Sequence, residues 1–172
     1  MTAPRLACCA ALAAALAAAP ALAQQANPQI DYPGFARLVG DLEPVRQSHR
    51  LGWEEFSRQA RSGEAILLDA RSASAYARGH LAGAINLPFT DFTAEALAEV
   101  LGDDPDRPIY IYCNNNFTDD RDPVPVKAAP LALNIPTFIN LHGYGYRNVW
   151  ELAGTLRFAD LGGAWVTGAE PG

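Results

Sequence analysis

Residues 109 to 118 read IYIYCNNNFT, and this stretch decides how the rest of the chain is interpreted. The run from Ile109 to Tyr112 is short, apolar and rich in β-branched and aromatic residues, which is typical of a strand that crosses a covered sheet. The run ends on Cys113 and a polar turn. Because α/β proteins place their chemistry at the carboxyl ends of their strands, Cys113 is the first candidate for a functional residue.

Segments of strand and helix alternate on both sides of this stretch. Strands are predicted at 65–69, 84–87 and 148–152, and helices at 35–45, 53–62, 72–79 and 93–101. A further helix is expected within 126–141, kinked or split by Pro130 and Pro136, because a proline inside a helix removes a hydrogen bond. The alternation predicts an α/β fold: one domain with a central parallel sheet and helices on both faces.

Length and charge limit the possible functions. The chain has 172 residues, of which 49% are hydrophobic, and this is enough for one domain with a core. A formal net charge of −6 argues against a nucleic-acid partner, because nucleic-acid binding needs clustered Lys and Arg. The sequence has no glycine fingerprint for phosphate and no ligand cluster at metal spacing, so we expect no metal and no other cofactor.

The first 23 residues resemble a cleavable export signal. Arg5 precedes a run of Ala and Leu from Ala7 to Ala19, and Ala21 and Ala23 occupy the small-x-small positions before Gln24. The run is shorter than the roughly 20 residues that a membrane-spanning helix needs, which favours cleavage over an anchor. We therefore expect an exported protein of the bacterial periplasm, with no membrane association after cleavage.

Cleavage at that point would leave Cys113 as the only thiol, since the other cysteines are Cys8 and Cys9. A single thiol forms no intramolecular disulfide. In an oxidising compartment such a thiol is either buried and inert or its reactivity is used. We interpret Cys113 as reactive, and the alternative is an inert core cysteine.

Four segments in this order resemble the rhodanese-like domain family. They are Leu68-Asp69-Ala70-Arg71, residues 79–87 (GHLAGAINL), residues 110–113 (YIYC) and residues 145–149 (GYRNV). They are similar to the family's Asp-x-Arg and Gly-His-x-x-Gly-Ala-x-Asn signatures, its cysteine strand and its late Gly-Tyr-x-Asn-Val strand. Together with the export signal, the proline-containing tether and the glycine-rich end, the resemblance divides the chain into four expected regions. These are a signal peptide (1–23), a tether with a short helix (24–50), the rhodanese-like domain (51–160) and a flexible tail (161–172).

The resemblance implies a sulfurtransferase with Cys113 as nucleophile. In this family the cysteine thiolate takes a sulfane sulfur from a donor, holds it as a persulfide and passes it to a thiol acceptor. Backbone N–H groups of the loop and of the following helix are expected to keep the Cys113 thiol ionised. The implied active-site loop consists of Asn114, Asn115, Asn116, Phe117, Thr118 and Asp119.

The loop departs from the family pattern at Asp119. The family usually has an arginine six residues after the cysteine, and Asp119 occupies that position here. A nearby carboxylate opposes an incoming dianion by about 1 kcal/mol, so we expect a donor less anionic than thiosulfate. Phosphatase chemistry is disfavoured because its transition state needs the guanidinium. The following helix is expected to start late, at Asp122-Pro123.

Several residues remain open to two interpretations. Asp69 and Arg71 could bind substrate or form a structural ion pair, and Arg121 could replace the missing arginine or remain solvated. The asparagines could be substrate-binding amides or turn formers. The whole protein could be a sulfurtransferase or persulfide carrier that acts on a small sulfur donor and a thiol acceptor. Alternatively, it could be a non-catalytic module whose loop binds a protein partner.

Overall fold

The computed structural model describes residues 27–168, so the predicted signal peptide and residues 169–172 lie outside the described part. The chain divides into two units, Met1–Asp31 and Tyr32–Gly172. Of the first unit only residues 27–31 are described, and Ile30 N donates to Asn27 O there at 3.1 Å. The second unit contains the fold and the candidate site.

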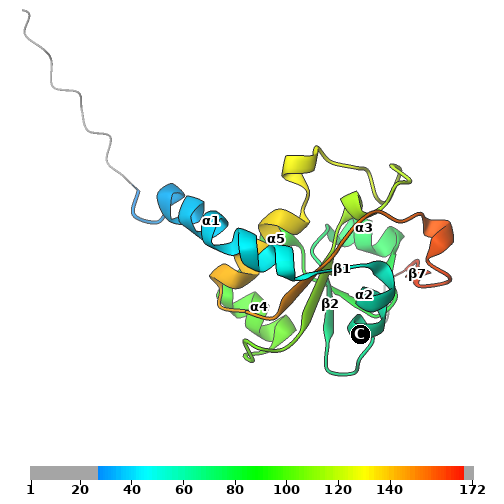
Figure 1. Ribbon diagram of the computed structural model, residues 1–172, viewed down its shortest axis with the longest axis horizontal. Helices are drawn as coiled ribbons and strands as arrows, with labels where there is room; N and C mark the ends of the chain where they lie inside the picture. Colours follow the sequence, from blue (N-terminus) through cyan, green and yellow to red (C-terminus); the bar gives the residue numbers. More distant parts are fainter. Residues whose placement is uncertain (1–26, 169–172) are drawn as a thin grey trace, which may run out of the picture. The chain divides into compact units, whose positions relative to one another are not determined.

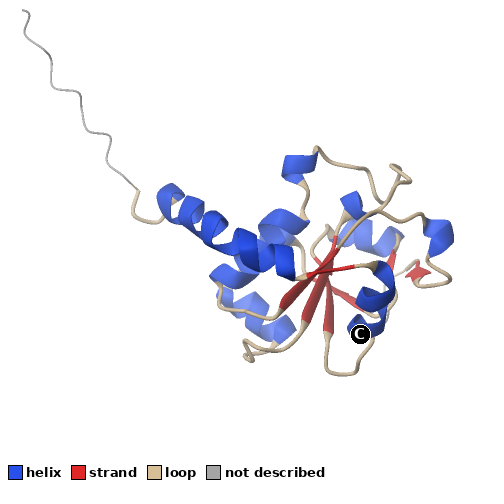
Figure 2. Ribbon diagram, in the orientation of Figure 1, coloured by secondary structure: helices blue, strands red, loops and turns tan. Residues whose placement is uncertain are grey.

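Five parallel strands form the main sheet, in the order β1-β6-β5-β2-β4 (Figures 1 and 2). Their bounds are Arg50–Leu51 (β1), Ile66–Asp69 (β2), Ala84–Asn86 (β4), Ile109–Tyr112 (β5) and Val149–Leu152 (β6). In the middle strand β5, Tyr112 lies beside Asp69 of β2, and Ile111 lies beside Glu151 of β6. The predicted α/β fold with a central parallel sheet is confirmed.

Helices cover both faces of this sheet (Figure 1). One face carries α1 (Tyr32–Ser48), α4 (Ala94–Leu101) and α5 (Asn134–Gly143), and the other carries α2 (Trp53–Ala60) and α3 (Ala73–Arg78). Along β5, Ile109 and Ile111 join the core under α4 and α5, whereas Tyr110 and Tyr112 join the core under α2. The middle of the sheet is therefore buried on both faces, as in other parallel sheets.

Two of the helices, α3 and α4, begin at polar residues that cap them. The Ser72 side chain accepts from Ala75 N at 3.3 Å and starts α3, and the Thr93 side chain accepts from Ala96 N at 3.1 Å and starts α4. The first helix is longer than predicted from the sequence and packs against α5. Within residues 27–168, no helix has the length and apolar character needed to span a bilayer.

A long connection joins β5 to α5 (Figure 1). The connection contains two 3-10 helices, η2 (Asn114–Asn116) and η3 (Ala129–Leu131). Two more lie elsewhere in the described chain, η1 (Phe89–Asp91) and η4 (Phe158–Asp160). The predicted split of the helical region is confirmed, with Pro130 in η3 and Pro136 in α5. The predicted helix start at Asp122-Pro123 is wrong, because these residues lie in a turn closed by a hydrogen bond from Val124 N to Arg121 O.

The residues after Leu161 belong to the domain. β7 (Trp165–Val166) pairs antiparallel with β3 (His80–Leu81), and Leu161 is buried. The Trp165 ring lies 5.1 Å from the Phe117 ring and 4.6 Å from the Phe158 ring. The prediction of a flexible tail is therefore wrong for residues 161–168, because one tryptophan anchors this glycine-rich segment to the core.

Candidate active site

Cys113 lies directly after β5 and is 1% exposed. Its sulfur accepts backbone N–H groups from two sides. Asn115 and Asn116 donate from η2, and Leu133 and Asn134 donate from the start of α5. The arrangement gives Sγ the polar surroundings that were expected from the loop and the following helix.

Burial decides the charge of this thiol. Removal from water raises the pKa of Cys113, the N–H groups of Asn134, Asn115 and Leu133 lower it, and the negative charge of Glu151 raises it. The net direction is upward, so the thiol is protonated at neutral pH. The expectation that the amides keep the thiol ionised is therefore wrong for this closed conformation, because they do not offset the loss of water.

Two of the three asparagines hold the long connection in place. Asn114 Nδ2 donates to Pro125 O at 3.0 Å. Asn115 Nδ2 donates to Lys127 O at 2.7 Å, and its Oδ1 accepts from Lys127 N at 3.1 Å. These bonds support the turn-forming interpretation. Asn114 Oδ1 is buried and has no hydrogen-bond partner in the described part of the chain.

Asn116 connects the cysteine to the end of β6. Its Oδ1 accepts from Cys113 N at 2.9 Å and from Asn134 Nδ2 at 3.0 Å. Its Nδ2 donates to Leu152 O at 2.8 Å and to Gly154 O at 3.1 Å. With its side chain fully used, Asn116 fixes the backbone around the thiol and is not free to bind substrate.

Phe117 and Thr118 lead the chain away from the thiol. Phe117 is buried against Tyr112 and Trp165 in the aromatic core. The Thr118 backbone N–H donates to Leu156 O at 2.9 Å, so the loop runs beside the segment after β6. Phe117 therefore packs in the core, and the exposed Thr118 is held by its backbone hydrogen bond.

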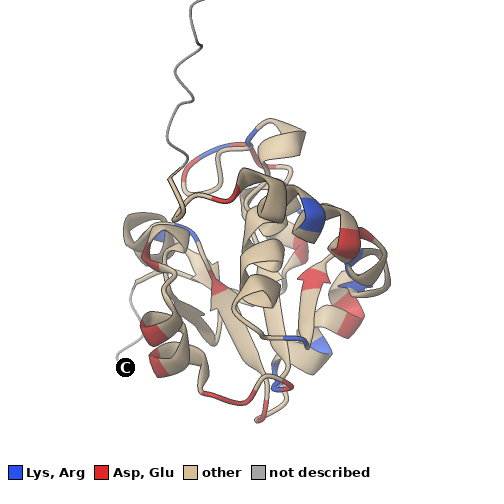
Figure 3. Cartoon of the chain, turned by 90° about the vertical axis from the view of Figure 1, so that its left-hand side faces the viewer, with Lys and Arg blue, Asp and Glu red and all other residues tan. Residues whose placement is uncertain are grey.

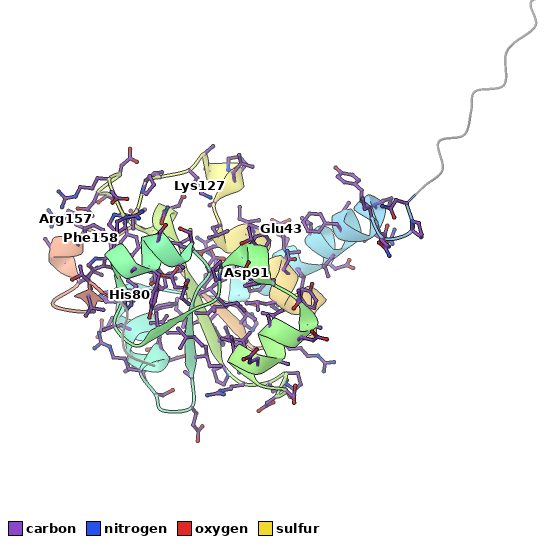
Figure 4. The ribbon with its side chains drawn as sticks, turned by 180° about the vertical axis from the view of Figure 1, so that it is seen from behind. Glu43, His80, Asp91, Lys127, Arg157 and Phe158 are labelled. Atoms are coloured by element: carbon purple, nitrogen blue, oxygen red, sulfur yellow. The ribbon has the colours of Figure 1, made fainter. Side chains whose placement is uncertain are left out.

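Asp119 does not face the thiol. Its Oδ2 accepts from Phe158 N at 3.1 Å, and its Oδ1 lies 3.9 Å from Arg121 Nη2 (Figure 4 labels Phe158). The side chain of Arg121 is 71% exposed. Asp119 therefore binds the segment after β6, and Arg121 does not replace the missing guanidinium beside Sγ.

Asp69 and Arg71 form a buried ion pair. Arg71 Nη2 lies 2.6 Å from Asp69 Oδ2, and Tyr112 Oη donates to the same oxygen at 2.6 Å. Arg71 also donates to Gly79 O at 2.7 Å and to Pro123 O at 3.3 Å. The pair ties β2 and β5 to the long connection, which supports the structural interpretation over substrate binding.

A row of polar side chains continues from Asn116 across α5 and β6 to α1. Asn134 Nδ2 lies 3.4 Å from Glu151 Oε1, and Arg46 Nη2 donates to the same oxygen at 2.6 Å. We call Asn116, Asn134, Glu151 and Arg46 the polar row. The sequence did not lead us to expect Asn134, Glu151 or Arg46 near the site. A glutamate inside the apolar strand 149–152 (VWEL) was the signal that could have indicated one of them.

A pocket of about 370 Å³ lies beside the cysteine loop. Its charged lining residues are the cations Arg71, Arg78 and Lys127, and alanine, proline and phenylalanine side chains supply apolar walls. Asn115 and Leu133 also line it, and their N–H groups point at Sγ. The pocket and the thiol therefore share a wall.

Lys127 is the least neutralised of these cations. Arg71 is paired with Asp69, and Arg78 lies 2.8 Å from Asp122. Lys127 is exposed on the long connection (Figure 4). Most other charged residues also lie on the helices and loops around the sheet (Figure 3). The pocket thus combines apolar walls with a cationic edge, a combination that suits an organic anion.

The histidines bind backbone carbonyls. His80 is buried, its Nδ1 lies 2.9 Å from Tyr76 O, and its ring stacks on Tyr76 (Figure 4 labels His80). His49 Nδ1 and His142 Nδ1 likewise lie at hydrogen-bond distance from carbonyls one turn earlier. Among residues 27–168, no three side chains of His, Cys, Asp or Glu are grouped so that they could hold a metal ion.

Comparison with known families agrees with this architecture. The family model described as Rhodanese-like domain matches residues 53–157, more than half of the chain. The chain belongs to the rhodanese-like domain family. The matched segment runs from the start of α2 to the residue before η4, and it includes Cys113 and the Asp69–Arg71 pair.

Two solved structures are similar to part of this chain. The rhodanese-like domain of the Alr3790 protein from Anabaena sp., solved by NMR, is 22% identical with a TM-score of 0.48, covering 72% of this chain and 88% of that one. The BH2092 protein from Bacillus halodurans is 18% identical with a TM-score of 0.46, covering 72% of this chain and 77% of that one.

One curated relative is a regulator. An HTH-type transcriptional regulator, Rv0324 from Mycobacterium tuberculosis (strain ATCC 25618 / H37Rv), is 40% identical over 63 residues, which are 37% of this chain and 26% of the regulator. The match spans about a quarter of the regulator's length, so it concerns only part of that protein.

The helix α1 and the strand β7 lie outside the segment that matches the rhodanese-like family model. Both nevertheless contact the family core. α1 supplies Arg46 of the polar row, and β7 supplies Trp165 of the aromatic core. The rhodanese-like core of this chain is therefore completed by segments on both sides of the family match.

Proposed function

We propose that the protein is a rhodanese-like sulfurtransferase or persulfide carrier that uses Cys113 as its nucleophile. The position of Sγ carries the proposal: it lies at the carboxyl end of β5, where η2 and α5 both direct backbone N–H groups toward it. Such donors stabilise an anionic sulfur, whether this is the thiolate or the outer sulfur of a persulfide.

The proposed reaction passes one sulfur atom between thiols. The Cys113 thiol loses its proton, and the thiolate attacks the sulfane sulfur of an organic persulfide. The sulfur–sulfur bond of the donor breaks while a new one forms at Cys113. The donor leaves as a thiolate that takes up a proton. A thiol acceptor then removes the sulfane sulfur in the same way, so no external oxidant or reductant is consumed.

The closed thiol must open for this reaction. Asn115 and Leu133 separate Sγ from the pocket, and both are only half-buried. They adjoin the long connection, whose residues 125–131 are exposed to solvent. Segments with few buried contacts open locally at low cost, so movement of this wall would join the pocket to the thiol.

The pocket favours a persulfide whose organic part carries a carboxylate. Its apolar walls suit the carbon skeleton, and Lys127 and Arg78 attract the carboxylate. Thiosulfate lacks such an organic part, and the groups that bond to Sγ are uncharged N–H groups without a guanidinium among them. The signal-like residues 1–23 support a site of action in the periplasm.

Mass spectrometry of Cys113 tests this function. The native protein is incubated with glutathione persulfide, mercaptopyruvate or thiosulfate, and we expect one added sulfur atom on Cys113, fastest from glutathione persulfide. Cys113→Ser is the control and should gain none. If no donor adds sulfur, although the thiol of the unfolded protein reacts with alkylating reagents, the sulfurtransferase proposal is refuted and a non-catalytic module is indicated.

A matched pair of cation variants tests the role of the pocket. Lys127→Gln should slow loading from glutathione persulfide about two- to fivefold, because an exposed charge contributes little more than this. Arg121→Gln lies in the same connection but does not line the pocket, so it should load at the unchanged rate. Equal rates for the two variants would show that Lys127 does not attract the donor.

A further inference from the structure

The side chain of Arg46 links the helix α1 to the neighbourhood of the thiol. Arg46 lies in the last turn of α1, which packs against α5 (Figure 1). Its Nη2 donates to Glu151 Oε1 at 2.6 Å, and the side chains of Arg46 and Glu151 are 24% and 5% exposed. A contact this short and this sheltered from water is stronger than a surface ion pair.

The contact continues to the amides that face Sγ. Glu151 Oε1 lies 3.4 Å from Asn134 Nδ2, and Asn134 is the residue whose backbone N–H donates to the sulfur from α5. The Asn134 side chain also donates to Asn116 Oδ1, which in turn accepts from Cys113 N. Arg46 is thus linked to both sides of the thiol by side chains with fixed partners.

Glu151 is the charged group that acts on the thiol most directly. Its negative charge disfavours the thiolate, and Arg46 is its partner. At the end of β2, Asp69 and the nearby Arg71 neutralise each other at 2.6 Å. The groups of η2 and α5 that bond to the sulfur are uncharged N–H groups, and Asp119 binds Phe158 N instead. Glu151 is therefore the charged group through which a change at Arg46 can reach Cys113.

We propose that Arg46, on a helix outside the family match, is a positioning residue of the cysteine site that orients Glu151 and Asn134 and compensates the carboxylate beside the thiol. The proposal rests on the proposed function, because it matters only for a thiol that reacts. It assigns α1 a role in the site in addition to its packing against α5.

A structural role and a positioning role predict different measurements. If Arg46 has only a structural role, its replacement lowers the unfolding temperature and does not change the pH at which Cys113 ionises. If Arg46 compensates Glu151, its replacement also raises the pH at which the thiol ionises, and removal of the Glu151 charge reverses that change.

The test is the ultraviolet absorbance of the thiolate as a function of pH, taken as the difference from a protein with the same change plus Cys113→Ser. This readout does not require a reagent to reach the buried sulfur. We expect Arg46→Gln to raise the midpoint by about half a pH unit or more, and Glu151→Gln to lower it. Arg46→Lys, which keeps the charge, should stay near the wild-type midpoint.

The double variant Arg46→Gln/Glu151→Gln should titrate close to Glu151→Gln, because no carboxylate then needs compensation. Equal midpoints in all four variants would overturn the proposal, with thermal unfolding used to confirm that each variant is folded. If Arg46→Gln does not fold, Glu151→Gln decides alone, since an unchanged midpoint contradicts the coupling. Sulfur loading is a separate measurement, so shifted midpoints in a protein that accepts no sulfur would refute the function and not the coupling.

Discussion

Two ion pairs flank β5, and they differ in how completely their atoms are bonded. In the Asp69–Arg71 pair, the carboxylate also accepts from Tyr112, and the guanidinium also donates to two backbone carbonyls. In the Arg46–Glu151 pair, Arg46 Nε and Glu151 Oε2 are buried without a partner among the described residues. We call the first pair the closed pair, because its buried side-chain atoms are bonded, and the second the open pair, because two of its buried atoms have no hydrogen bond among the described residues.

The difference indicates separate roles for the two pairs. A fully bonded pair that joins three parts of the chain makes the arrangement of β2, β5 and the long connection unique. A pair in which some polar atoms have no hydrogen bond contributes less to the stability of the fold and more to the electrostatic field around it. The same sheet edge therefore holds one pair suited to structure and one suited to tuning a reactive group.

The largest effect is expected at the closed pair. Asp69→Ala leaves Arg71 buried without its carboxylate and removes the acceptor of Tyr112, so it should lower the free energy of unfolding by about 3–5 kcal/mol. Urea denaturation measures this. The exposed pair partner Asp160→Asn is the control and should leave the transition unchanged. A small loss at Asp69 would show that the pair does not lock the fold.

A smaller effect is expected at the open pair. Arg46→Gln removes the partner of the buried Glu151 carboxylate, but position 46 is partly exposed and Asn134 remains beside the carboxylate, so the free energy of unfolding should fall by about 1–3 kcal/mol. The same urea experiment measures it, with the exposed Arg50→Gln as the matched control. A loss as large as that of Asp69→Ala would remove the distinction between the two pairs.

The smallest effect concerns pH. The pKa of Cys113 is raised in the folded state, so the unfolded chain releases this proton at a lower pH than the folded chain does. The contribution of the thiol to the free energy of unfolding is therefore fully present at neutral pH and decreases as pH rises above about 8.5. Cys113→Ala should lose less stability between about pH 7 and about pH 9.5. Urea denaturation at both values compares the two proteins. Equal slopes would mean that the thiol is not held protonated by burial.

The fold could be predicted because its signals are local. The apolar runs at 65–69 and 109–112 have β-branched and aromatic residues, and glycines and capping residues separate them from the helices. Each run became a strand of the main sheet. Cys113 was found for the same reason, since the end of a predicted strand also marks the place of a side chain.

The remaining features of the site depend on contacts that are distant in sequence. Arg46 and Glu151 are 105 positions apart, and no pattern links them. The pKa of Cys113 depends on burial and on the N–H groups of Leu133 and Asn134, which the loop sequence does not contain. Asp122-Pro123 has the composition of a helix start, but these residues form a turn, and the hydrogen bonds between Asn115 and Lys127 tie the connection to the cysteine loop.

The indole of Trp165 occupies space that only a glycine at position 79 leaves open, since a Cβ there would overlap the ring. The family match stops at residue 157, before this tryptophan. A recombinant chain trimmed at that boundary would lose the cover over Phe117 and the strand partner of Leu81. Fragments meant to represent the domain must therefore extend through Val166, or they present an aromatic surface to the solvent.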